Sequence, residues 1–131
     1  MILPAPTWLL DFWDRVRQRR VVVELRVHRG WFPSAPERGE CYFLNIKNSS
    51  PEREVTVTHV WVASHPPVHA PVESPSPRIK PGGQWETWVS AGDVPAGTEN
   101  VEWLGRARLG DDTELRSVPR HDVPPAGYIP R

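Results

Sequence analysis

A run of β-branched and aromatic residues near the middle of the chain most constrains its fold. Residues 54–63, EVTVTHVWVA, hold four valines and one tryptophan. Such residues favour a pleated, half-buried strand, and a Ser-Ser-Pro turn and a Pro-Pro pair bound the run. Its alternation changes phase near Thr58 and His59, which indicates either a β-bulge there or a strand covered on both faces. We interpret the run as the central strand of a sheet.

Period-two alternation of apolar residues recurs on both sides of this strand. It predicts further strands at residues 21–28, 40–48, 84–90, 101–109 and 113–118. The turn at 48–53 is compact, so strands 40–48 and 54–63 are expected to pair as an antiparallel hairpin. A second hairpin is expected across Gly110-Asp111-Asp112.

Local composition also predicts how some of these segments are connected and oriented. Residues 64–77 are rich in proline, which cannot donate to a β-ladder, so they are expected to form an edge crossing or an extended loop. Residues 80–83 predict a tight turn, and residues 91–97 predict a corner with one helical turn. Trp85 and Trp88 have opposite parity, so at most one of them points between the sheets. In the strand at 101–109, the expected inward residues are Val101, Trp103, Ala107 and Leu109.

Length and charge set broad limits on organisation and partners. With 131 residues the chain is expected to form one domain, with the β-rich body at 21–118 and a proline-rich C-terminal tail at 119–131. Sixteen acidic and sixteen basic residues cancel, so no global field attracts nucleic acid, and no nucleic-acid partner is expected. One cysteine, Cys41, excludes an intramolecular disulfide.

The N-terminal segment, residues 1–20, predicts a short amphipathic helix capped by Thr7. Its apolar arc includes Trp8, Phe12 and Trp13, and arginines concentrate toward its C-terminal end. So short a helix needs a surface to bury this arc. Three surfaces remain open: the chain's own sheets, another subunit, or a membrane surface. The segment matches neither a signal peptide nor a membrane span, which favours a cytoplasmic or virion-associated protein.

Three segments resemble small immunoglobulin-like or fibronectin-III-like domains of bacteria and their phages. They are FLNIKNSSPEREVTVTHVWV (43–62), RIKPGGQWETWVSAGDVP (78–95) and WLGRARLGDDTELRS (103–117). The resemblance concerns the fold and implies an all-β, two-sheet antiparallel sandwich of about seven strands. Within it, Trp61 is the nearest match to the tryptophan of immunoglobulin domains. Such domains usually bind other molecules, so the resemblance implies binding rather than catalysis.

Candidate reactive residues are few. His65 and His69 could bring two imidazoles together, but zinc needs three or four ligands and Glu73 is the only carboxylate near them in the sequence. His59, on the central strand, is interpreted as a packed or edge histidine. No catalytic, metal-binding or cofactor-binding residue is assigned, no small-molecule substrate is inferred, and the chain is predicted not to be an enzyme.

Seven tryptophans in a chain of this length need an explanation. They can fill a core that is poor in leucine and isoleucine, or some of them can form an outward patch for a partner. The candidate partner-binding residues are Trp8, Phe12, Trp13, Trp31, Phe32 and Trp88. The expected function is a protein-interaction or structural module, with a phage-virion or assembly component as one form. The alternative is a peripheral membrane module anchored by the N-terminal helix.

Overall fold

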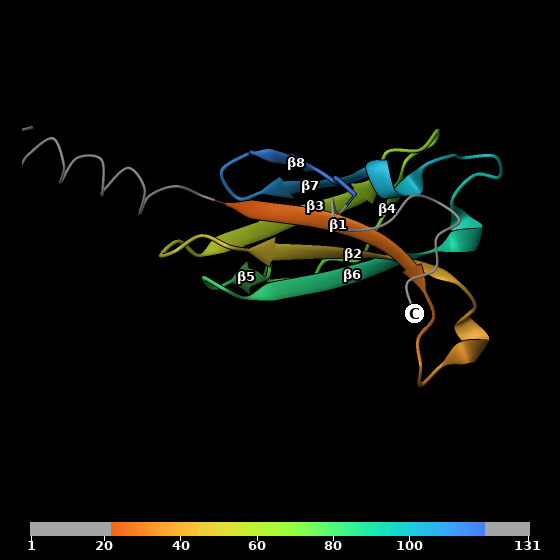
Figure 1. The fold of residues 1–131 in the computed structure, drawn as a ribbon, viewed down its shortest axis with the longest axis horizontal. Coiled ribbons are helices and arrows are strands. Elements are labelled where there is room, and N and C mark those ends of the chain that lie inside the picture. The colour runs from red at the N-terminus through yellow and green to blue at the C-terminus, as the bar shows by residue number, and fades with distance from the viewer. Residues whose placement is uncertain (1–21, 120–131) are drawn as a thin grey trace, which may run out of the picture.

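The chain forms two antiparallel β-sheets that share one buried core, and the computed structural model describes residues 22–119. The first sheet has the order β1–β2–β6. Its strands are β1 (Val23–Gly30), β2 (Cys41–Asn48) and β6 (Gln84–Ser90). The second has the order β4–β3–β7–β8, and β5 also pairs with β3 (Figure 1). Its strands are β4 (Val68–His69), β3 (Val55–Val62), β5 (Arg78–Ile79), β7 (Gly105–Leu109) and β8 (Glu114–Arg116). The predicted all-β class is confirmed.

Alternate residues of facing strands fill the space between the sheets. On β2, Leu44 and Ile46 point inward and are fully buried, as the alternation predicts. The other fully or almost fully buried apolar side chains of the interior include Val57, Val60, Val62 and Ala107. Burial of one such aliphatic side chain contributes about 2 kcal/mol to folding. The period-two pattern therefore identifies the core correctly on these strands.

The predicted central strand is β3, and its predicted irregularity is present. β3 pairs with β4 and β5 along one edge and with β7 along the other. The register between β3 and β7 shifts between Val57 and His59. The extra residue of this bulge lets Val57 and Val60 both face the core despite their odd spacing.

The predicted hairpin of residues 40–63 is wrong, because β2 and β3 belong to different sheets. Asn48 gives the physical reason, since its side chain is fully buried where the chain passes from one sheet to the other. Its Nδ2 donates to the carbonyls of Arg53 (2.7 Å) and Ile79 (2.9 Å), and its Oδ1 accepts from the backbone N–H of Ser50 (3.0 Å). These bonds hold an arch between the sheets.

The predicted strand at 101–109 is wrong in its first half. Residues Val101–Trp103 form the 3₁₀ helix η3, and β7 begins only at Gly105. Trp103 is therefore exposed rather than inward-facing. Gly105 lies so close to β1 that a Cβ atom on it would be 2.5 Å from Cγ2 of Val27. A larger residue there would have to displace the side chain of Val27.

Several connections match their predictions. The turn at 80–83 leads into β6, a 3₁₀ turn (η2, Ala91–Asp93) forms the predicted corner, and β7 pairs with β8 across the predicted turn. The proline-rich crossing passes beside β6, where Thr87 Oγ1 donates to the carbonyl of Pro71 (2.6 Å). The N-terminal helix and the tail beyond residue 119 lie outside the described residues.

Candidate protein-interaction surface

Three side chains form a row across the outer face of the first sheet. His28 on β1 is directly opposite Phe43 on β2, and Phe43 is directly opposite Trp88 on β6. Directly opposed residues of neighbouring antiparallel strands project from the same face. The His28 and Phe43 rings stack with their centroids 5.4 Å apart. The register of three strands thus assembles an aromatic platform near one end of the sheet.

The segment between β1 and β2 folds back onto this platform. Phe32 packs edge-on against both Phe43 and Trp88, with a centroid separation of 5.2 Å in each case. The short 3₁₀ helix η1 (Pro36–Arg38) then brings the guanidinium of Arg38 to 5.1 Å from the Phe32 ring centroid and 5.8 Å from that of Trp88. Both distances allow cation–π attraction. We call His28, Phe32, Arg38, Phe43 and Trp88 the aromatic loop cluster.

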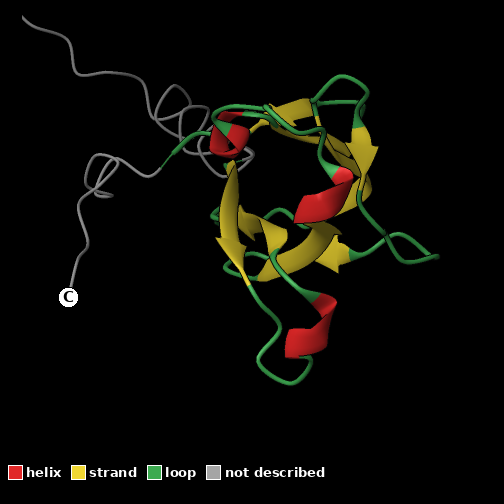
Figure 2. Ribbon diagram, turned by 90° about the vertical axis from the view of Figure 1, so that its right-hand side faces the viewer, coloured by secondary structure: helices red, strands yellow, loops and turns green. Residues whose placement is uncertain are grey.

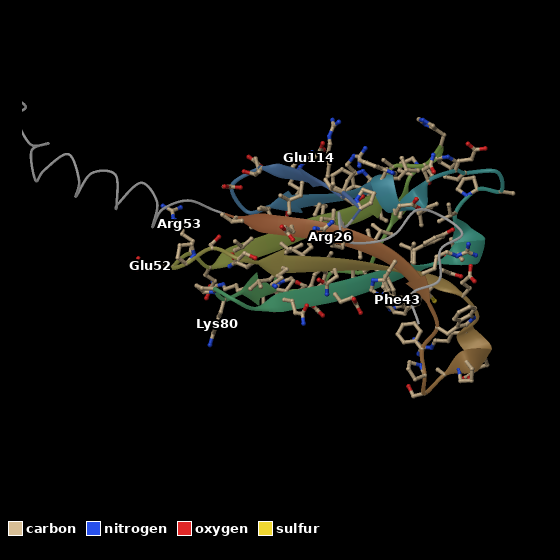
Figure 3. All side chains as sticks on the ribbon, viewed as in Figure 1. Arg26, Phe43, Glu52, Arg53, Lys80 and Glu114 are labelled. Carbon is tan, nitrogen blue, oxygen red and sulfur yellow. The ribbon has the colours of Figure 1, made fainter. Side chains whose placement is uncertain are left out.

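The aromatic loop cluster buries residues that a bare sheet face would expose. Phe43 retains only 9% of its surface, and Cys41, on the same face of β2, is fully buried. The Cys41 thiol lies 3.7 Å from the carbonyl of Gly39 in the overlying loop. Figure 3 shows Phe43 where the loop leaves the sheet, and Figure 2 shows the loop and η1 protruding from the body. The loop therefore protrudes from the body but is packed against the first sheet at its base.

Trp31 stands at the edge of the cluster and is 59% exposed. It directly precedes Phe32, whose packing fixes the backbone at this point. On its other side, Arg29 forms an ion pair with Glu40 at the base of the loop. The hydrogen bond with Glu40 raises the pKa of Arg29 above its ordinary value. The loop thus presents a large exposed indole from an anchored position.

The structure brings together two of the six predicted partner-binding residues. Phe32 packs against Trp88 although the two are far apart in sequence, and Trp31 directly precedes Phe32 and is exposed. Trp8, Phe12 and Trp13 lie outside the described residues, so their role stays a prediction.

Sequence reasoning missed His28, Phe43 and Arg38 as members of the cluster. The sequence shows that His28 and Phe43 both face outward on their strands, but it predicts that they are neighbours only if the register between β1 and β2 is known. Arg38 lies in a polar loop, and nothing in the sequence near it indicates a contact with aromatic rings.

The other three described tryptophans take different positions. Trp85 faces the inner side of β6 and its Nε1 donates to Glu73 (3.0 Å), whereas Trp88 faces outward, as their opposite parity requires. Trp103 on η3 is 53% exposed. Trp61 lies on the outer face of β3, opposite Arg106 and His69, and not between the sheets. The suggested match to the immunoglobulin tryptophan therefore fails for Trp61.

The candidate reactive residues do not assemble into a recognisable centre. Among residues 22–119, no three histidine, cysteine, aspartate or glutamate side chains come close enough to hold a metal ion. His69 instead lies beside Trp61, with ring centroids 6.2 Å apart. Asp111 accepts a hydrogen bond from Thr113, and this contact lowers the pKa of the Asp111 carboxyl. Asp111 thus serves the β7–β8 turn.

Comparisons with known proteins return no match. No protein-family model matches the chain, and neither a curated protein nor a solved structure matches it. No helix among residues 22–119 is long and apolar enough to cross a membrane.

Proposed function

We propose that this chain is a non-catalytic protein-interaction module that docks a protein partner through Trp31 and the aromatic loop cluster. The observation that carries the proposal is an indole that is 59% exposed on a loop whose next residue is packed in place. A structural role in a virion or another assembly is the form of this function that we favour.

Residue type and rigidity both support this choice of surface. Tryptophan and arginine are the residues that most often dominate the binding energy of protein interfaces, and Trp31 and Arg38 lie on the same short loop. Binding costs less when the contact residues are already ordered. Here the packing of Phe32 against Phe43 and Trp88 orders the loop before a partner arrives.

We further propose that the two-sheet fold is immunoglobulin-like, and the strand order supports this. In that architecture strands A, B and E share one sheet, while C, F and G share the other, which can gain C′. Here β1–β2–β6 corresponds to A–B–E, and β4–β3–β7–β8 corresponds to C′–C–F–G. The departures from immunoglobulin domains are the outward position of Trp61, the single cysteine and the pairing of β5 with β3.

The substitution Trp31→Ala tests the docking surface, with Trp103→Ala as its matched control. Both indoles are more than half exposed, but Trp103 is on η3, outside the aromatic loop cluster. We expect Trp31→Ala to weaken partner capture from native lysate, or self-association in sedimentation velocity, by at least about tenfold, which corresponds to about 1.4 kcal/mol. Trp103→Ala should leave both unchanged.

Three outcomes would contradict the proposal. The wild-type chain could stay strictly monomeric and recover no partner, or the two variants could behave alike. The wild-type chain could also float with anionic vesicles in a Trp31-independent way, which would favour the membrane alternative instead.

A further inference from the structure

The outer face of the second sheet concentrates arginine side chains. Arg106 and Arg108 alternate on β7 with Ala107 and Leu109, which are buried between the sheets, so both arginines project outward. Arg116 on β8 is directly opposite Arg106 and shares its face. We call this surface the basic face. Its other side chains are His59, Trp61, His69 and Glu114.

The strand register places two arginines opposite each other on the basic face. Arg106 is directly opposite Arg116, whereas Arg108 is directly opposite Glu114 on β8 and His59 on β3. Directly opposed like charges destabilise an antiparallel pair. Among these opposed residues of β3, β7 and β8, Glu114 supplies the carboxylate, and it is 3.9 Å from Arg116. These rows thus hold three arginines and one carboxylate, and a negative partner would offset the excess positive charge.

The first sheet does not share this arrangement. On its outer face Glu24 is opposite Lys47, Arg26 is 3.4 Å from Glu24, and His28 is 3.9 Å from Glu86. Acidic and basic groups thus balance on the outer face of the first sheet, whereas arginines outnumber carboxylates on the rows of β7 and β8. The chain's zero net charge conceals this difference, so the balance of the whole sequence does not describe the local field.

We propose that the basic face binds an acidic, extended segment of a protein partner. Same-face residues on a strand repeat at about 6.6 Å, the spacing expected between Arg106 and Arg108. An extended segment presents every second carboxylate at the same repeat. A guanidinium offers a planar fork of donors that matches a carboxylate. An acidic strand laid along β7 can therefore pair with successive arginines.

Two contacts indicate that the face is ordered before binding. Nη1 of Arg106 donates to the carbonyls of Trp103 (2.9 Å) and Gly105 (2.8 Å), which fixes its side chain. The guanidinium of Arg108 lies 6.0 Å from the Trp61 ring centroid, with His69 beside the same ring. A nucleic-acid platform stacks bases on open aromatic faces. The crowding of Trp61 by Arg108 and His69 favours carboxylates over bases.

The basic face is separate from the aromatic loop cluster. One lies on the outer side of the second sheet and the other on the outer side of the first, and Figure 3 shows Glu114 and Phe43 on different parts of the molecule. The two proposals can therefore fail independently.

A peptide-binding measurement on the full chain tests the basic face. The probe is a fluorescein-labelled peptide of alternating glutamate and threonine, followed by anisotropy. We expect the double variant Arg108→Gln, Arg116→Gln to weaken binding by at least about tenfold. The control, Lys47→Gln with Lys80→Gln, removes the same charge away from the basic face, and Figure 3 shows Lys80 at the end of the molecule opposite Phe43. This control should bind within about twofold of wild type.

Stability provides a second readout that separates lost binding from misfolding. Replacing Arg116 ends both its repulsion with Arg106 and its exposed contact with Glu114, and these two effects are small and opposite. The urea midpoint of Arg116→Gln should therefore stay close to that of wild type while binding weakens. The proposal is overturned if both double variants bind the peptide equally or if a glutamine version of the peptide binds as well. It is also overturned if oligothymidylate binds more tightly than the acidic peptide.

Discussion

Asn48 shows how one buried amide determines the path of the chain. Asn48 follows an alternating strand, and because Asn is a common turn residue, the sequence predicts that a polar turn begins there. In the structure it is fully buried and bonds to Arg53, Ile79 and Ser50. A buried polar group needs such partners, because desolvation without them costs free energy. These three bonds join the arch after β2 to β5.

The substitution Asn48→Ala should lower the free energy of unfolding by about 2 kcal/mol. It leaves the carbonyl of Ile79 and the N–H of Ser50 without their partner in a buried site. Urea denaturation measures the change. Asn45→Ala is the control, since the Asn45 amide makes only long contacts of 3.4 Å to Gln84 and Glu86 on the sheet surface. If the two variants lose the same stability, the amide of Asn48 does not hold the arch.

The β1–β2 loop is ordered by its contacts with the first sheet. Its residues, from Trp31 to Glu40, include three prolines or glycines and contain little regular structure beyond η1. Phe32 nevertheless anchors the loop on the aromatic row of the first sheet. Cys41 lies under this loop and reports on its attachment, because a thiol reacts only when it is accessible.

The substitution Phe32→Ala should release the loop and expose the Cys41 thiol. We expect the rate of labelling by a thiol reagent under native conditions to rise by about tenfold, since local opening controls access to a buried group. Trp31→Ala is the control, because the Trp31 indole is 59% exposed and is not one of the rings that pack against Phe32. Equal labelling rates for the two variants would show that Phe32 does not hold the loop down.

At the scale of the whole molecule, the two sheets are stable only together. Each sheet buries one face, and both faces contribute to the same cluster, with Leu44 from the first sheet and Val60 from the second. Small single domains with one core usually unfold in a single transition. Neither sheet has a core of its own within residues 22–119.

The substitution Leu44→Ala should therefore destabilise both sheets at once. A cavity of this kind costs about 2–5 kcal/mol. The urea midpoints measured by far-UV circular dichroism and by tryptophan fluorescence should fall by the same amount. The fluorescence reports on both sheets, because Trp85 belongs to one sheet and Trp61 to the other. Lys47→Ala, at an exposed site on the same strand, should change stability by less than about 0.5 kcal/mol. Separate transitions for the two probes would contradict a shared core.

Prediction from sequence succeeded where the physical signal is local. Side chains alternate along any strand whatever its partner, so the alternation located β2, β3 and β6. The change of phase near His59 allowed either a bulge or a strand covered on both faces, and the structure has the bulge. Prediction from sequence failed where the structure depends on contacts with a segment that is distant in the chain. A Cβ at Gly105 meets Val27, a residue far away in the chain, and nothing near residue 105 reveals that contact. The exposed Trp103 was misassigned for the same reason.

By itself, the sequence determined the all-β class, the positions of most strands and most of the inward-facing residues, because period-two hydrophobicity depends only on the geometry of an extended chain. The tertiary structure decided which strands pair, and therefore which outward side chains become neighbours. Phe32 reaches Trp88, and Arg106 faces Arg116, only once the register across separate strands is set. Contacts between residues distant in sequence depend on the whole core, which no local pattern encodes.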